Sequence, residues 1–252
     1  MYRERAASIA GAVLWTSTVP AGAAPTRVLP DGCLDLLWSS RAGLLVAGPD
    51  RTAHLAVGRP GERWVGLRLP PGVGPAVLGV PADELRDRRV PLADLWGERV
   101  AADLAERVAL APGEALTAGE ALTAVAAARL RAAGGADPVG GRIADRLAAG
   151  ATVAATAAEL GLDPRVLRRR CLPLFGYGPK TLARILRMRR ALALAHAGTP
   201  LAEVAARSGY ADQAHLTREV RDLAGVPPTV LLRAAQPTAV PASSAGPTGS
   251  GA

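Results

Sequence analysis

The same short pattern occurs twice between residues 153 and 235. Each copy reads Ala-x3-Gly, then Leu-x-Arg-x6-Gly-x2-Pro, and only the joint between Gly and Leu differs, by one residue. The first copy consists of Ala157, Gly161, Leu167, Arg169, Gly176 and Pro179, and the second of Ala205, Gly209, Leu216, Arg218, Gly225 and Pro228. A pattern that recurs at this many positions predicts two copies of one helical unit.

Each copy has the residue types that a helix-turn-helix requires. Two helices that cross over a short turn need a small residue at the crossing, and the turn needs a residue that tolerates a positive φ. After each glycine, an apolar stripe at i, i+4 and i+7 predicts a second helix with one face buried. The predicted core residues are Ala157, Gly161 and Leu167 in the first unit, and Ala205, Gly209 and Leu216 in the second.

The ends of the second helices are also marked. Asp163 and Asp212 stand where an N-cap acceptor belongs, and a glycine stands where each helix should stop. The second helices are therefore expected over residues 163–174 and 212–223. One Ala-x3-Gly alone would fit a plain helical hairpin equally well. The matching Leu, Arg, Gly and Pro downstream favour DNA binding.

The repeat region resembles a known family. Ser208-Gly-Tyr-Ala-Asp-Gln-Ala-His-Leu-Thr-Arg218 and Phe175-Gly-Tyr-Gly-Pro-Lys-Thr-Leu182 are close to signatures of the DNA-binding domain of AraC/XylS transcriptional regulators. The resemblance covers residues 139–235. It implies two helix-turn-helix units joined by a long helix, expected over residues 179–197. Val220 and Cys171 depart from it, because the family often has an aromatic residue there, and we expect a smaller core at both positions.

The resemblance implies that the second helix of each unit enters a major groove. The residues it assigns to base reading are Arg165, Arg168, Arg169, Gln213, Ala214, His215 and Arg218, and Arg170, Lys180 and Arg221 are expected to contact phosphates. An alternative for Arg169 and Arg218 is a structural role. Asp145 or Glu159 could pair with the first, and Glu203 or Asp222 with the second.

Positive charge is concentrated in the same part of the chain. Residues 1–136 contain 15 basic and 14 acidic residues, whereas residues 137–252 contain 15 basic and 8 acidic ones. Such an asymmetry is typical of a surface that attracts nucleic acid. Concentrated charge alone would also fit a sequence-independent architectural DNA protein, which remains an alternative.

Other classes of protein are disfavoured. The two cysteines, Cys33 and Cys171, form neither a zinc pattern nor a disulfide framework. No signal peptide or run of eighteen apolar residues is present, so we expect a cytoplasmic protein without a membrane span. An enzyme is the least favoured alternative, because His54 is the only histidine of the N-terminal half and has no second ligand at metal spacing. No cofactor is expected.

The N-terminal half predicts a different fold. Short apolar runs at 9–19, 26–29, 33–38, 44–47, 54–57 and 64–69, separated by Gly and Pro, indicate a small antiparallel barrel or sandwich. Helices are expected at 75–80, 93–109 and 114–133. The predicted class is α+β, with a sensing or dimerisation domain at 1–136, the DNA-binding domain at 137–235 and a disordered tail at 236–252.

This arrangement favours a transcription regulator that binds double-stranded DNA. Leu29-Pro-Asp-Gly-Cys-Leu-Asp-Leu-Leu-Trp38 resembles the N-terminal region of a subset of AraC-type regulators. The resemblance implies the same family but names no effector, and we expect the N-terminal domain to bind a small-molecule effector, a partner or a second copy of the chain, with RNA polymerase as a further possible partner. The alanine-rich helix at 114–133 fits self-pairing and packing on its own barrel equally well.

Overall fold

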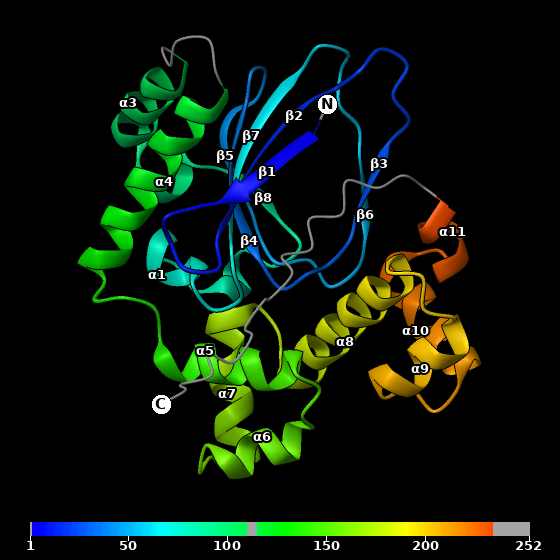
Figure 1. The fold of residues 1–252 in the computed structure, drawn as a ribbon. Helices are drawn as coiled ribbons and strands as arrows, with labels where there is room; N and C mark the ends of the chain where they lie inside the picture. Colours follow the sequence, from blue (N-terminus) through cyan, green and yellow to red (C-terminus); the bar gives the residue numbers. More distant parts are fainter. Residues whose placement is uncertain (1, 110–114, 234–252) are drawn as a thin grey trace, which may run out of the picture.

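A computed structural model describes residues 2–109 and 115–233. Its N-terminal half contains an antiparallel sheet of six strands, in the order β1-β2-β7-β4-β5-β8 (Figure 1). The strands are β1 (Tyr2–Ala6), β2 (Val13–Thr18), β4 (Leu34–Ser39), β5 (Gly43–Ala47), β7 (Arg63–Leu69) and β8 (Arg89–Pro91). A second sheet pairs β3 (Thr26–Val28) with β6 (His54–Ala56). This two-stranded ribbon stands apart from the main sheet and extends towards the C-terminal helices.

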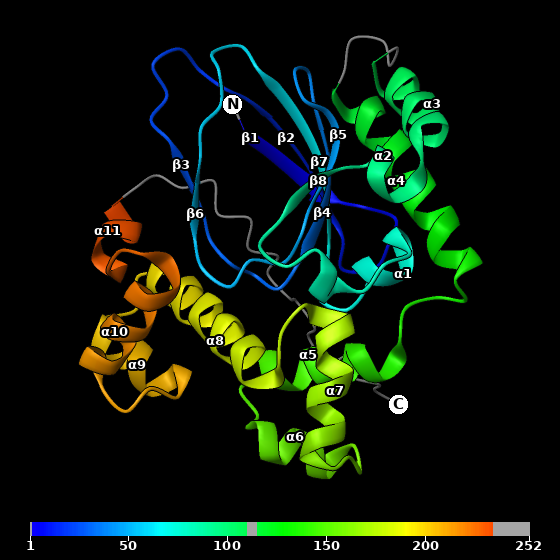
Figure 2. The ribbon, with the colours of Figure 1, turned by 180° about the vertical axis from the view of Figure 1, so that it is seen from behind.

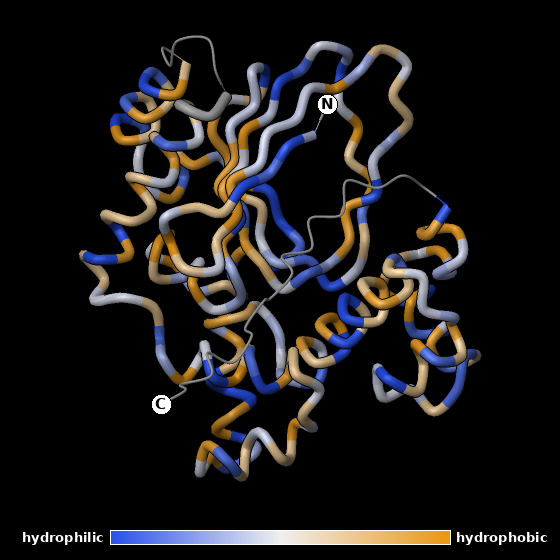
Figure 3. The backbone as a smooth tube through the Cα atoms, viewed as in Figure 1, coloured by the Kyte–Doolittle hydropathy of each residue, from blue (hydrophilic) through white to orange (hydrophobic). Residues whose placement is uncertain are grey.

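One face of the six-stranded sheet is covered by helices. These are α1 (Gly74–Leu78), α2 (Ala93–Trp96), α3 (Glu98–Ala109) and α4 (Ala115–Ala132), with a short 3-10 helix, η1, at Ala82–Glu84. Alternate residues of β4, such as Leu34 and Leu36, are fully buried in the same core as Leu122 of α4. This is the alternation expected of a strand with one face on a core. Figure 3 shows the hydrophobic stretches of the strands lying beside α4.

The opposite face of the sheet is more polar. Trp15 lies across from Gly66 in the β2–β7 pair, and a Cβ on Gly66 would lie 2.2 Å from the indole. Only glycine allows the ring to lie this close to the backbone. The indole Nε1 donates a hydrogen bond to Asp35 at 3.0 Å, and Arg68 pairs with Asp35 at 3.5 Å. The sheet therefore has one apolar face and one face with partly buried charges.

The C-terminal region is all helical. It contains α5 (Pro138–Ala148), α6 (Val153–Glu159), α7 (Pro164–Phe175), α8 (Pro179–His196), α9 (Leu201–Ser208), α10 (Gln213–Ala224) and α11 (Pro228–Arg233). Its buried side chains form a cluster of their own, separate from the core under the sheet. Leu29, next to β3, is the N-terminal residue buried in that second cluster. None of the helices in the two described ranges is long and apolar enough to cross a membrane.

The predicted α+β class is confirmed, with an antiparallel sheet followed by a helical C-terminal domain. Six predicted strands are present, but the first begins at Val13, because Ile9 lies in a turn. β1 and β8 were not predicted, and the expected helix at 93–109 is broken at Gly97, whose φ is 82°. The expected tail at 236–252 and the predicted first residue of α4, Glu114, lie outside the described residues.

Candidate DNA interface

The turn after the first helix closes in the same way in both units. The two signature glycines have φ values of 64° and 77°, which only glycine adopts readily. In the first unit the amide of Leu162 donates to the carbonyl of Ala157 at 2.9 Å. In the second, the amide of Tyr210 donates to the carbonyl of Ala205, also at 2.9 Å. This bond, from the residue after the left-handed glycine back to the carbonyl five residues earlier, is the usual closure of such a helix end.

The second helix of each unit, α7 in the first and α10 in the second, is its predicted reading helix, and each begins at the predicted cap. The Asp163 carboxylate accepts from the amide of Arg165 at 2.7 Å, and the Asp212 carboxylate accepts from the amide of His215 at 2.6 Å. The additional residue of the second copy lies in its turn, where the buried ring of Tyr210 is followed by Ala211. The one-residue difference between the copies is therefore absorbed before the second helix begins.

Four of the six predicted core residues are buried, whereas Gly161 and Gly209 are exposed, because each lies in the turn between the two helices of its unit. Ala157, Leu167, Ala205 and Leu216 are at most 3% exposed. Val220 and Cys171 are also fully buried, and burial raises the pKa of the Cys171 thiol to about 12. The sulfur is thus held as a neutral, packed thiol. Both positions belong to the C-terminal core, as the apolar stripe of each helix predicts.

The first reading helix presents three arginines to solvent. Arg165, Arg168 and Arg169 are exposed, and their side chains form no hydrogen bond or ion pair within residues 2–109 and 115–233. Arg170 differs from them, because its Nη2 lies 3.1 Å from the carboxylate of Asp137, the N-cap of α5. Of the four arginines at the predicted contact positions of α7, three are free to contact a ligand and one braces the domain.

The second reading helix presents a mixed set. Gln213, Ala214 and Arg218 are exposed, whereas His215 is half-buried. The Nδ1 of His215 accepts from the amide of Ala211 at 3.2 Å, and its ring meets Tyr210 edge to face at a centroid distance of 5.2 Å. This hydrogen bond assigns the ring proton of the neutral imidazole to Nε2, which is thereby left as a donor.

Three of the four acidic residues considered as braces for Arg169 and Arg218 have other partners, and the fourth, Asp145, forms no side-chain hydrogen bond or ion pair within the described ranges. Glu159 pairs with Arg146 at 2.8 Å, and Glu203 pairs with Arg207 at 3.3 Å. Asp222 lies 3.7 Å from Arg184 of α8. The candidate phosphate contacts Lys180 and Arg221 are exposed, and neither side chain has a hydrogen-bonded or ionic partner in the part of the chain that the structure describes.

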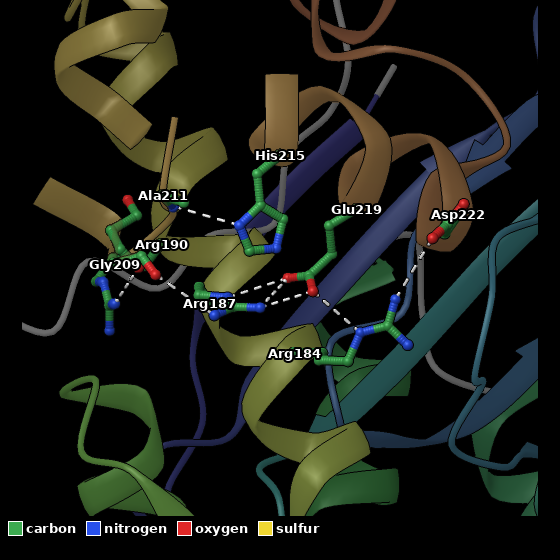
Figure 4. A network of polar contacts seen from close by, with 9 residues as sticks. Arg184, Arg187, Arg190, Gly209, Ala211, His215, Glu219 and Asp222 are labelled. Carbon is green, nitrogen blue, oxygen red and sulfur yellow. Dashed lines mark hydrogen bonds and ion pairs between the residues drawn. The ribbon is translucent and has the colours of Figure 1, made fainter. Parts of the chain in front are cut away.

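A buried carboxylate on the second reading helix was missed by the sequence analysis. Glu219 is 6% exposed and accepts hydrogen bonds from Arg187 at 2.6 and 2.7 Å and from Arg184 at 3.1 Å (Figure 4). Burial opposes ionisation of Glu219, but the hydrogen bonds from Arg187 and Arg184 outweigh it and hold the pKa of the carboxyl below its ordinary value. The sequence does contain a signal for this contact: two arginines three positions apart on one helix, and one acidic residue on the apolar stripe of the other.

Arginines on the same face of α8 also contact both halves of the C-terminal domain. Arg187 also stacks over the Tyr210 ring, with its guanidinium carbon 4.5 Å from the centroid. Arg190 donates to the carbonyl of Ala148 at the end of α5 and to that of Ser208 at the end of α9, at 2.8 and 2.9 Å. α8 has 18 residues, hence a length of about 27 Å. Part of the positive charge counted from sequence therefore holds the domain together.

The N-terminal candidates are engaged within their own domain. His54 lies 3.2 Å from Asp50, which also pairs with Arg89. Cys33 is a free cysteine, and burial raises the pKa of its thiol well above the ordinary value, with a further contribution from Asp31. Within residues 2–109 and 115–233, no group of three His, Cys, Asp or Glu side chains is arranged to hold a metal ion.

Two protein families match parts of the chain. Residues 156–234 match a family described as a helix-turn-helix domain. Residues 12–91 match a family described as a domain of unknown function (DUF6597). A search of curated proteins gave no match. The first match spans both units from Thr156 to the end of α11, and the second spans most of the N-terminal sheet.

Solved structures similar to this chain include three that differ in extent. The C-terminal domain of AraT, a response regulator from Geobacillus stearothermophilus, is 24% identical, with a TM-score of 0.36 over 38% of this chain and 85% of that one. A probable AraC family transcriptional regulator from Rhodopseudomonas palustris CGA009 is 23% identical, with a TM-score of 0.35 over 40% and 100%. ToxT from Vibrio cholerae O395 is 8% identical, with a TM-score of 0.46 over 92% and 96%.

Proposed function

We propose that this chain is a DNA-binding transcription regulator of the AraC family, and that its C-terminal helix-turn-helix domain reads one asymmetric site with both units. α7 and α10 each enter a major groove, in two successive turns of one face of the duplex. Arg165, Arg168 and Arg169 read the first box. Gln213, Ala214, His215 and Arg218 read the second, and Lys180 and Arg221 contact phosphates.

One observation carries this proposal. The arginines on the outer face of α7 are exposed and unpaired within the described ranges, whereas those on the inner face of α8 are bound to carboxylates and carbonyls. An unpaired guanidinium can form two hydrogen bonds to guanine O6 and N7, and a glutamine can do the same with adenine. The spacing is compatible with the proposal, because α8 is about 27 Å long and successive major grooves are about 34 Å apart.

The remaining arginine of α7 takes a different role in this proposal. Arg170 was predicted to contact phosphate, but its guanidinium is held by Asp137 at the start of α5. We assign it to bracing α5 against α7. A phosphate contact there would require Arg170 to leave a carboxylate that also caps a helix through Val139 and Gly140.

We assign ligand or partner sensing to the N-terminal domain, and no catalytic step to either domain. The polar face of the sheet supports a binding role, because it holds Arg68 between Asp31 and Asp35 at 3.3 and 3.5 Å, and the Arg68 Nε is buried without a hydrogen bond of good geometry. A buried polar group that is incompletely satisfied favours a site where something else can bind. The proposal also includes control by a small-molecule effector, pairing with a second copy of the chain and contact with RNA polymerase.

The test is selection of random duplex DNA by the full-length protein at near-physiological salt. Enrichment of an asymmetric motif with two boxes about one helical turn apart is the expected result, because α8 packs against both units and holds both reading helices in one domain. Two variants assign the boxes: Arg168→Ala should change preference in one box only, and Arg218→Ala in the other only. Arg207→Ala is the matched control, since it removes the same charge from a residue paired with Glu203 on α9.

Two other outcomes would reject the proposal. Binding without enrichment, with an affinity that falls equally for all sequences as salt rises, would instead support the architectural alternative. Enrichment of a single box that responds to only one of the two variants would show that only one unit reads bases.

A further inference from the structure

Both reading helices end against the N-terminal domain. At the end of α7, the carbonyl of Gly176 accepts a hydrogen bond from Arg86 Nη1 at 2.8 Å. At the end of α10, the carbonyl of Ala224 accepts from Arg27 Nη1 at 2.9 Å. The last carbonyls of a helix have no partner within the helix and carry partial negative charge, so a guanidinium is a favourable partner there. Each reading helix thus receives one arginine from the other domain.

The contacts fall within one residue of the same position in the repeat, because the Gly176 carbonyl belongs to the terminal glycine and the Ala224 carbonyl to the residue before it. Gly176 and Gly225 are the same glycine in the two copies, and both have a positive φ. A Cβ on Gly176 would lie 2.5 Å from the Pro49 ring, and a Cβ on Gly225 would lie 3.1 Å from Arg27 Nη1. The glycines that end the reading helices therefore also permit the close approach of the N-terminal domain.

The two arginines come from separate parts of that domain. Arg86 follows η1, whose Ala82 is fully buried in the core under the sheet. Arg27 lies in the β3–β6 ribbon, which meets the second unit beside α10 and α11 in both views (Figures 1 and 2). The ribbon adds a hydrogen bond of 2.7 Å from the amide of Ala53 to the carbonyl of Leu223. One domain therefore contacts both reading helices at once.

These contacts close a ring. α8 joins the first unit to the second, and the N-terminal domain joins the end of α7 to the end of α10. With α8 alone, the second unit can pivot about one helix, whereas a second connection fixes the separation and the mutual angle of the reading helices. The contacts lie at the C-terminal ends, so the exposed side chains from Arg165 to Arg169 and from Gln213 to Arg218 stay accessible.

We propose that Arg27 and Arg86 are positioning residues through which the N-terminal domain sets the spacing between the two DNA boxes. This inference rests on the proposed function, because it requires both units to read DNA. The connection through Arg27 is the more easily broken of the two. It stands on a two-stranded ribbon, and such a ribbon has little stability of its own. Arg86 is carried by a segment anchored in a core.

The first test uses a library in which the two selected boxes are separated by spacers of every length over one helical turn. The wild-type chain should prefer one spacing. Arg27→Ala should lower that preference, relative to the next-best spacing, by about tenfold, the order expected for loss of a hydrogen bond from a charged donor. Base preference within each box should not change. Arg27→Lys keeps one donor and should restore part of the spacing preference.

The second test measures the free protein. Spin labels at Ala158→Cys and Ala206→Cys, in a Cys33→Ala background, report the distance between the units from exposed and repeat-matched positions. Arg27→Ala should broaden the distance distribution because it releases the second unit from the N-terminal domain. Arg86→Ala should broaden it because it releases the first unit. Arg99→Ala is the control and should leave it unchanged, because Arg99 is an exposed residue of α3, which lies far from the C-terminal helices in both views.

The outcomes separate this inference from the proposed function. If the wild-type chain selects no two-box motif, the proposed function fails, and the distance measurement still tests the connection. If the wild-type chain selects such a motif, and Arg27→Ala keeps the wild-type spacing preference and distance distribution, the inference is overturned and the proposed function stands. A change of base preference within the boxes in Arg27→Ala would also overturn it, because that would indicate general damage to the fold.

Discussion

Arg187 and Glu219 form a two-pronged ion pair between α8 and the second reading helix, with Arg187 Nε 3.0 Å from Oε1 and Nη2 2.6 Å from Oε2 of Glu219. The pair places a fixed charge contact beneath α10, on the side away from its exposed residues. Because a guanidinium and a carboxylate meet in one plane, the pair restrains the rotation of α10 about its own axis. It therefore bears on which side chains α10 presents.

Replacing Glu219 by Gln should destabilise the C-terminal domain by about 1–3 kcal/mol, below the full cost of breaking a buried pair, since Arg187 and Arg184 keep some contact with water. Urea denaturation measures the loss. Glu203→Gln removes the same charge from an exposed pair with Arg207 and should cost at most about 1 kcal/mol. Equal losses in the two variants would contradict a special role for the buried pair.

The contribution of Glu219 should depend on pH with a definite sign. Despite the opposing effect of burial, hydrogen bonds from Arg187 and Arg184 hold the pKa of Glu219 below its unfolded-state value, which is 4.5. The stabilisation is therefore complete above that pH and is lost as pH falls through the folded-state pKa. The difference in free energy of unfolding between wild type and Glu219→Gln should be constant near neutral pH and shrink in acid. A difference that grew in acid would require the opposite shift.

Removing a base-reading arginine should differ in kind from removing a phosphate contact. Arg168→Ala should cost about 1–3 kcal/mol on the selected site and relax preference at one base position. Lys180→Ala should weaken binding to all sequences alike and reduce the slope of log K against log salt by about 1. Titrations of matched and mismatched duplexes at several salt concentrations separate the two. An unchanged base preference in Arg168→Ala would remove Arg168 from the readers.

The two kinds of glycine in the repeat should tolerate alanine unequally. Gly209 has a φ of 77° and no atom lies within 4 Å of the position that a Cβ would take, so alanine there costs only the left-handed conformation, about 1–2 kcal/mol. Gly176 has a φ of 81° and a Cβ would lie 2.5 Å from Pro49, so overpacking adds about 1–3 kcal/mol. Thermal unfolding of the two variants compares them. Equal losses would mean that Gly176 does not contact the N-terminal domain closely.

The sequence by itself determined the local design of the C-terminal domain. The helix caps at Asp163 and Asp212 and the glycine turns depend on hydrogen bonds between residues a few positions apart, so their spacing is enough to predict them. The alternating strands β4 and β7 were predictable for the same reason, because one buried face imposes a period of two. The assignment of two helix-turn-helix units, supported by the family match over residues 156–234, followed from these local rules.

Only the tertiary structure decided which distant groups meet. The sequence offers many arginines, and nothing local separates Arg170, which pairs with Asp137, from its exposed neighbour Arg169. β1 was missed because Tyr2–Ala6 is short, charged and at the edge of the sheet, so it is specified by pairing with β2 and not by its own pattern. The placement of Arg27 and Arg86 at the ends of the reading helices likewise depends on how two separate cores pack against each other, and a pattern of neighbours along the chain contains no information on that distance.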